Sequence, residues 1–133
     1  MRKQARESAF KVIYKSLFVE NDFSTNEILE EDLIVSEEDV SFVNTLVELY
    51  SLNKDYINDC INKKVKGYTP ERVYRIDRAI LALALTEIEF YKQTPLKIVI
   101  NEAIEMAKKY STEKSYSFIN GMLKSLTEGQ NVV

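Results

Sequence analysis

Apolar residues recur at every third or fourth position along most of this chain, and strict alternation of apolar and polar residues is rare. A period near 3.6 residues is typical of amphipathic α-helices, whereas alternation is typical of strands. Only three glycines and two prolines interrupt the pattern in 133 residues. We therefore predict an all-α fold of about seven helices.

The first part of the pattern predicts two helices. One spans about residues 3–19, and its inward stripe consists of Ala5, Ala9, Val12, Ile13 and Leu17. The next spans about residues 24–33 and begins at Ser24 or Thr25, both good N-cap residues. Its expected inward residues are Ile28, Leu29 and Leu33.

Ser36 stands before three acidic residues, an order that predicts a helix N-cap followed by anions that the helix dipole favours. This helix is expected to end near Tyr50, and Asn53 is expected to cap a further helix that stops at Gly67. The expected inward residues of the two helices are Val40, Val43, Leu46, Val47 and Tyr50, then Tyr56, Ile57, Cys60 and Ile61.

The interruption near residues 51–53 is also the only plausible internal boundary. We interpret residues 1–133 as one domain made of two packed helical subdomains, because each half is too small to be stable alone. The N-terminal subdomain covers about residues 1–51 and the C-terminal one about residues 52–129.

Two Thr-Pro pairs, Thr69-Pro70 and Thr94-Pro95, each predict a cap followed by the first residue of a helix. The helix after the first pair is apolar on nearly every side across residues 79–85, so we expect it at the buried centre. The helix after the second pair is expected to bury Ile100, Ala103, Ile104 and Ala107.

We expect that helix to pair Glu105 with Lys109 at its surface and to end at Tyr110. Thr112 is the expected cap of the last helix. The inward residues of that helix are Ile119, Met122, Leu123 and Leu126.

Charge is unevenly distributed along the chain, although the net charge is only -3. Residues 1–15 hold five cations and one anion, residues 16–60 hold one cation and twelve anions, and residues 61–133 return to a net +4. This asymmetry suggests that a polyanion binds near the N-terminus and that an acidic face keeps the polyanion away from the rest of the protein. A solvated helix end explains the cations equally well at this point.

The residue types argue against most enzyme classes. There is no histidine, and Cys60 is the only cysteine, so no intramolecular disulfide is possible. Glu102 and Glu105 lack the histidines of di-metal helical bundles, and Ser8 and Ser115 lack a base. We expect no catalytic residue, no metal ligand and no cofactor. No membrane-spanning run or signal peptide is visible, so a cytoplasmic location is expected.

Two aromatic residues and one glycine are candidates for a binding surface. Tyr14 lies at the edge of the first helix's apolar stripe, beside Lys3, and Phe118 is offset from the inward side of the last helix. Either ring can stack a base, but ordinary half-buried packing is an equally simple explanation. Gly121 is unusual inside a helix, where it is destabilising, and close packing or close approach of RNA would explain it.

The order of three sequence blocks provides a more specific indication. The stretch INEAIEMAKKYSTEKSYSFINGML (residues 100–123) strongly resembles the signature of the NusB family of bacterial transcription antitermination factors. RIDRAILALALTEI (residues 75–88) and RKQARESAFKVIY (residues 2–14) resemble the family's preceding helix and its basic opening helix. The resemblance therefore spans essentially the whole chain.

The resemblance implies an RNA-binding protein. Members bind boxA-type RNA of ribosomal RNA operons together with a small-subunit ribosomal protein, NusE, and join the elongating RNA polymerase complex with other Nus factors. It places partner binding at Asp77, whose carboxylate would meet a basic protein. The residues that it implies for RNA binding are Arg2, Lys3, Arg6, Tyr14 and Phe118.

The chain departs from the family pattern at four positions. Gln4 interrupts the basic opening, and Ser117 replaces a lysine that some members carry, so weaker phosphate attraction is expected. Lys114 stands where an acidic residue is frequent, and it places a further RNA-binding cation beside Phe118. Lys124 replaces a common aspartate.

Two other functions fit the same residues. The fold also resembles the N-terminal domain of certain ribosomal RNA cytosine methyltransferases, so the chain could serve as an accessory RNA-binding module. Alternatively, it could be a structural homodimer when free, in which the basic end of one copy meets the acidic region of another. Neither a membrane nor a small-molecule partner is expected.

Overall fold

The computed structural model describes residues 2–65 and 73–128. Within these residues the chain forms six α-helices and one π-helical turn, η2, and no β-strand, which confirms the all-α prediction. The elements are α1 (Arg2–Ser16), α2 (Asn26–Glu31), α3 (Glu37–Lys64), α4 (Arg75–Thr86), η2 (Glu87–Tyr91), α5 (Leu96–Tyr110) and α6 (Ser115–Leu126).

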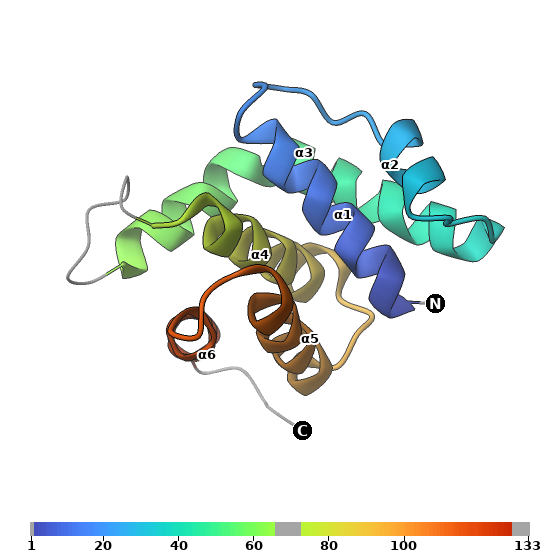
Figure 1. Ribbon diagram of the computed structural model, residues 1–133. Helices are drawn as coiled ribbons and strands as arrows, with labels where there is room; N and C mark the ends of the chain where they lie inside the picture. Colours follow the sequence, from blue (N-terminus) through green and yellow to red (C-terminus); the bar gives the residue numbers. More distant parts are fainter. Residues whose placement is uncertain (1, 66–72, 129–133) are drawn as a thin grey trace.

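Helix α4 is the centre of the fold, as its all-round apolar sequence predicts. Its residues 79–85 are each at most 2 % exposed. Helices α1 and α3 pack against it from one side and α5 and α6 from the other (Figure 1). Burial of each large aliphatic side chain is worth about 1.5–3 kcal/mol, so α4, buried on every side, contributes strongly to hydrophobic stabilisation.

Helix α3 is continuous, and the predicted interruption near residues 51–53 is wrong. The side chains of Ser51 and Asn53 hydrogen-bond back to the carbonyls of Glu48 and Leu49, both at 2.8 Å, instead of capping a new helix. Such bonds let polar residues remain inside a helix. With a span of about 1.5 Å per residue, the 28 residues of α3 form a rod of about 42 Å. The proposed boundary between subdomains therefore falls inside one helix.

The predicted cap at Ser36 is confirmed. Its hydroxyl accepts a hydrogen bond from the backbone N–H of Asp39 at 3.1 Å. The first turn of α3 is acidic and its last turn contains Lys63 and Lys64, so charges at both ends complement the helix dipole. The predicted stop at Gly67 and the cap at Thr69 and Pro70 lie outside the described residues.

At three other predicted caps the threonine hydroxyl makes no capping hydrogen bond, because it bonds to another side chain. Thr25 is the N-cap of α2, one of the two predicted residues, but its hydroxyl donates to Asn44 on α3 and accepts no hydrogen bond from an N–H of its own helix. Pro95 is itself the N-cap of α5, and the Thr94 hydroxyl donates to Glu87. Lys114 is the N-cap of α6, while the Thr112 hydroxyl bonds with that of Ser115.

Two predicted core residues face solvent. Leu33 is 79 % exposed, because the chain turns there through a left-handed backbone with φ of 56°. Tyr56 is 52 % exposed, because the side of α3 that faces the core carries Ile57 and Ile61 and Tyr56 lies off that side. In the described part of the chain, no helix is long and apolar enough to cross a membrane.

Candidate nucleic-acid interface

The first turn of α1 presents Arg2, Lys3 and Gln4 to solvent. The guanidinium of Arg2 lies 4.0 Å from the centre of the Phe42 ring and donates a 3.3 Å hydrogen bond to the Tyr91 hydroxyl. A guanidinium over a ring keeps its outer edge available for other acceptors. Arg2 is thus held in place by α3 and η2, whereas Lys3 forms no ion pair with any described residue.

Arg6 occupies a different position from its two predicted partners. It is only 7 % exposed, and its Nε and one terminal nitrogen donate to the two carboxylate oxygens of Glu87 at 2.8 and 2.7 Å. The Thr94 hydroxyl also donates to Glu87, at 2.6 Å. The guanidinium is therefore engaged inside the fold, and we assign Arg6 to the frame of the surface rather than to phosphate contact.

The Arg6–Glu87 pair also explains η2. Burial lowers the pKa of Arg6, but the hydrogen bonds and charge of Glu87 outweigh that effect, so the pKa lies above its ordinary range. Glu87 is 1 % exposed and opens the π-helical turn at the end of α4. The turn closes at Lys92, which has a left-handed φ of 62°. π-helical turns are frequent at functional sites, and this one begins at the residue that holds Arg6.

A shallow groove of about 270 Å³ separates α1 from α5, and its lining includes Lys3, Glu7, Lys108 and Lys109. Glu7 accepts hydrogen bonds from Lys109 Nζ and from the Tyr110 hydroxyl, both at 2.6 Å. Burial raises the pKa of Glu7, but these two donors and the nearby lysines hold it below its ordinary value. Glu7 thereby ties the end of α5 to the middle of α1. The predicted pairing of Glu105 with Lys109 is wrong, because Lys109 pairs with Glu7 and Glu105 pairs with Lys108 at 3.7 Å.

Tyr14 belongs to a row of aromatic rings along α1. Its ring centre lies 6.1 Å from that of Phe10 and 5.0 Å from that of Phe18. Tyr110, at the end of α5, continues the row with a centre 5.1 Å from Phe10. Tyr14 is half-buried, so packing fixes the ring while part of it stays accessible.

Helix α6 contains Phe118 and the exposed Gly121, and Lys114 stands at its N-cap. Lys114 is exposed and Phe118 is half-buried against the core. Tyr116, on the same helix, is 41 % exposed and has Lys108 Nζ 5.6 Å from its ring centre. The predicted packing explanation for Gly121 is wrong within the described chain, because a Cβ there would meet no heavy atom within 4 Å.

Asp77 is buried rather than displayed. It is 4 % exposed, and its carboxylate accepts hydrogen bonds from Ser111 at 2.6 Å and Ser115 at 3.0 Å. These bonds fasten the start of α4 to the connection between α5 and α6. These bonds hold the carboxylate inside the fold, so we assign Asp77 to positioning that connection, and its contact with a basic partner stays a prediction.

We define the basic edge as five exposed cations at the start of α1, the end of α5 and the N-cap of α6: Arg2, Lys3, Lys108, Lys109 and Lys114. Lys108, Lys109 and Tyr116 were not expected from the sequence as site residues. Lys108 and Lys109 are adjacent cations near the C-terminus of a helix, where they also suit the helix dipole, so no local signal marks them. Only the packing of α5 against α1 places them beside Lys3.

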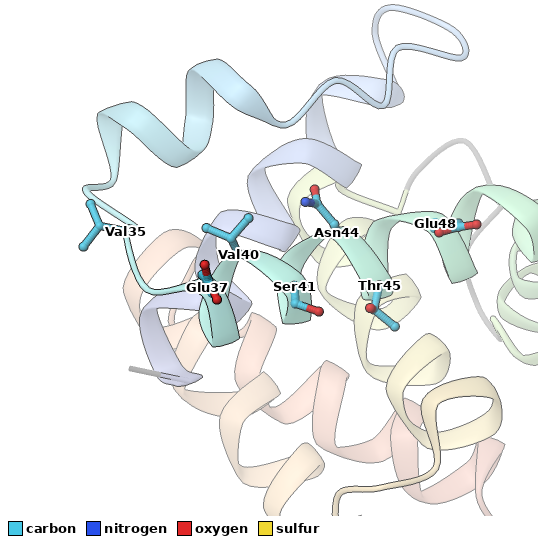
Figure 2. Close-up of a pocket in the computed structure, with 7 residues that line it drawn as sticks. All are labelled: Val35, Glu37, Val40, Ser41, Asn44, Thr45 and Glu48. Carbon is cyan, nitrogen blue, oxygen red and sulfur yellow. The ribbon is translucent and has the colours of Figure 1, made fainter.

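The acidic face lies on α2 and the first half of α3. We define it by its glutamates, which are Glu27, Glu30, Glu31, Glu37, Glu38 and Glu48. A groove of about 450 Å³ follows α3 there, and Figure 2 shows its side chains from Glu37 to Glu48, with Val35 in the connection that precedes the helix. Two glutamates in its lining repel phosphate, so this groove is a poor RNA site. Among the described residues no cluster of histidine, cysteine, aspartate and glutamate suits a metal ion.

Comparison with known proteins identifies one family. The NusB family model matches residues 3–128. A curated transcription antitermination protein NusB from Pediococcus pentosaceus is 42 % identical, over 96 % of this chain and 97 % of its own.

Solved structures give the same result. NusB from T. maritima is 29 % identical with a TM-score of 0.85, over 98 % of this chain and 92 % of its own. A crystal structure of the antitermination factors NusB and NusE in complex with dsRNA contains a chain that is 28 % identical with a TM-score of 0.88, over 97 % of both chains.

Proposed function

The chain belongs to the NusB family, and on that premise we propose that it is a transcription antitermination factor that binds boxA-type RNA of ribosomal RNA operons. In this proposal it binds the RNA as a heterodimer with NusE and joins the elongating RNA polymerase complex with other Nus factors. The observation that carries the proposal is the family match over residues 3–128, which includes the aromatic residues of α1 and α6 and every residue of the basic edge except Arg2. The protein acts by binding rather than by catalysis, and it works in the cytoplasm.

Arg2, Lys3 and Lys114 attract the phosphates, and Tyr14 and Phe118 stack bases. Lysine and arginine hold a strand through its backbone without selecting sequence, and a stacked base adds about 1–3 kcal/mol per ring. The two kinds of contact suit a single strand, whose bases are free to turn toward aromatic rings. Arg6 supports this surface through Glu87, and Asp77 supports it through the α5–α6 connection.

A titration of labelled boxA RNA tests the proposal. The protein is added alone and with purified NusE, and a scrambled RNA of the same composition serves as the control. We expect tighter binding to boxA than to scrambled RNA when NusE is present, and weaker binding as salt rises because phosphate contacts release counterions. Equal affinity for both RNAs in the presence of NusE would refute the proposal.

The charge contrast between the basic edge and the acidic face also suits association of two copies. Opposite patches on one molecule favour head-to-tail contact, which salt weakens. Measurement of the mass of the free protein at low and high salt therefore accompanies the titration. A dimer that dissociates on addition of RNA would identify self-association as the resting state of the same surface.

A further inference from the structure

Gly121 lies in the interior of α6, and nothing in the described chain accounts for it. Its backbone is helical, its position is exposed, and a Cβ added there would have no neighbour within 4 Å. Glycine destabilises a helix interior relative to alanine because it loses more backbone entropy on folding. The fold would therefore tolerate alanine at this position and be more stable with it.

The surroundings of Gly121 point to a ligand outside the chain. Lys114, Phe118, Gly121 and Ser125 follow one another at spacings of four, three and four, so they share one side of the helix. Ser117, beside them, is exposed and also small. Small residues thus border the Phe118 side chain, and another molecule can contact the helix backbone beside the ring. We call these residues, Ser117, Gly121 and Ser125, the strip.

The charge of α6 favours a polyanion as that molecule. The helix contains Lys124, follows directly on Lys114, and has no acidic residue between Ser115 and Leu126. These lysines repel a basic protein and attract phosphates. A base that stacks on Phe118 brings its own ribose and phosphate to the strip beside the ring.

We propose that Gly121 is the point at which the RNA backbone passes closest to the protein, next to a base stacked on Phe118. The missing side chain leaves room for the ribose and phosphate against α6. This inference rests on the proposed function and adds a contact residue whose role is steric. Its cost to helix stability is the consequence of keeping that space open.

The test compares Gly121→Ala and Gly121→Leu with the unchanged protein. Both substitutions supply a better helix former at an open position, so the denaturant midpoint of unfolding should rise. The affinity for boxA RNA should fall, modestly for alanine and by roughly fivefold or more for leucine, which displaces a stacked base. The salt dependence of binding should not change, because neither substitution removes a charge.

Two further variants make the result specific. Ser41→Ala also improves helix propensity, but Ser41 lies in the groove on α3 beside glutamates of the acidic face. This variant should therefore leave RNA affinity unchanged. Phe118→Ala should weaken RNA binding whether or not Gly121 is a contact.

The outcomes separate the inference from the proposed function. If both Gly121 variants bind RNA like the unchanged protein while Phe118→Ala binds more weakly, the inference is wrong and the proposed function stands. Loss of NusE binding with unchanged RNA binding, or a lower unfolding midpoint for Gly121→Ala, also overturns the inference. If the unchanged protein does not distinguish boxA from scrambled RNA, both fail.

Discussion

The basic edge and the acidic face differ less in the number of their charges than in how those charges are engaged. On the acidic face, none of the six defining glutamates pairs with a cation among the described residues. At the basic end, Arg6 is buried against Glu87, Lys109 pairs with Glu7 and Lys108 pairs with Glu105. A census of charge therefore overstates the cations that are available and describes the acidic face well.

The charges of the two surfaces also have different roles. Carboxylates near the start of α3 stabilise the helix dipole and remain in water, so they repel polyanions at little structural cost. Arg6 on α1 is engaged in fixing that helix to η2, and Lys109 on α5 is engaged in fixing α5 to Glu7 of α1. The cations that remain exposed are consequently held on a rigid surface, which lowers the entropy lost when they bind a ligand.

Replacement of Arg6 should produce the largest effect on stability. Arg6→Ala leaves the Glu87 carboxylate buried without its partner, and the free energy of unfolding should fall by about 3–5 kcal/mol in urea titrations. The double variant Arg6→Met with Glu87→Met should recover most of the loss, because it removes both charges and keeps the volume.

The same double variant tests whether Arg6 contacts phosphate. If Arg6 belongs to the frame only, the salt dependence of RNA binding should match that of the unchanged protein. A decrease of about 0.7 in the slope of log affinity against log salt would show that Arg6 contacts phosphate after all.

Removal of two cations that form no ion pair with a described residue, Lys3 and Lys114, should affect binding but hardly affect folding. Lys3→Ala with Lys114→Ala should reduce that slope by about 1.4, which is two phosphate contacts on a single strand. The matched control is Glu37→Gln with Glu48→Gln on the acidic face, which should leave the slope unchanged. An equal change in the two pairs would indicate that only net charge matters and that the two surfaces are not distinct.

The effect of acidification should be smaller than those of the Arg6 variants and of the Lys3 and Lys114 variants. The pKa of Glu7 in the fold lies below its ordinary value of 4.5, so the carboxylate stabilises the fold above that pH. This stability is lost as the pH falls below 4.5 and through the lowered pKa. The free energy of unfolding of Glu7→Gln should therefore depend less on pH in this acid window. Glu105→Gln, at an exposed ion pair, should show little change in pH dependence and serves as the control.

Features that depend on neighbouring residues were predictable from the sequence. The all-α class and the buried run of alanine and aliphatic residues in α4 follow from periodicity, and the cap at Ser36 follows from short-range hydrogen bonding. The predicted break in α3 failed because Ser51 and Asn53 look like cap residues but bond to carbonyls one turn earlier. The choice between these bonds depends on whether the residues beyond, such as Ile57 and Ile61, gain from burial by continuing the helix.

The sequence by itself determined the charge contrast, the helical periodicity and the family signature, because each is a property of residue type and spacing. Only the tertiary structure decided which charged residues are exposed. Arg6 and Asp77 look like binding residues in the sequence, and the fold buries both, since their partners Glu87, Ser111 and Ser115 lie more than thirty positions away. Gly121 shows the converse. Its open surroundings cannot be inferred from spacing, because an empty neighbourhood depends on where every other helix lies.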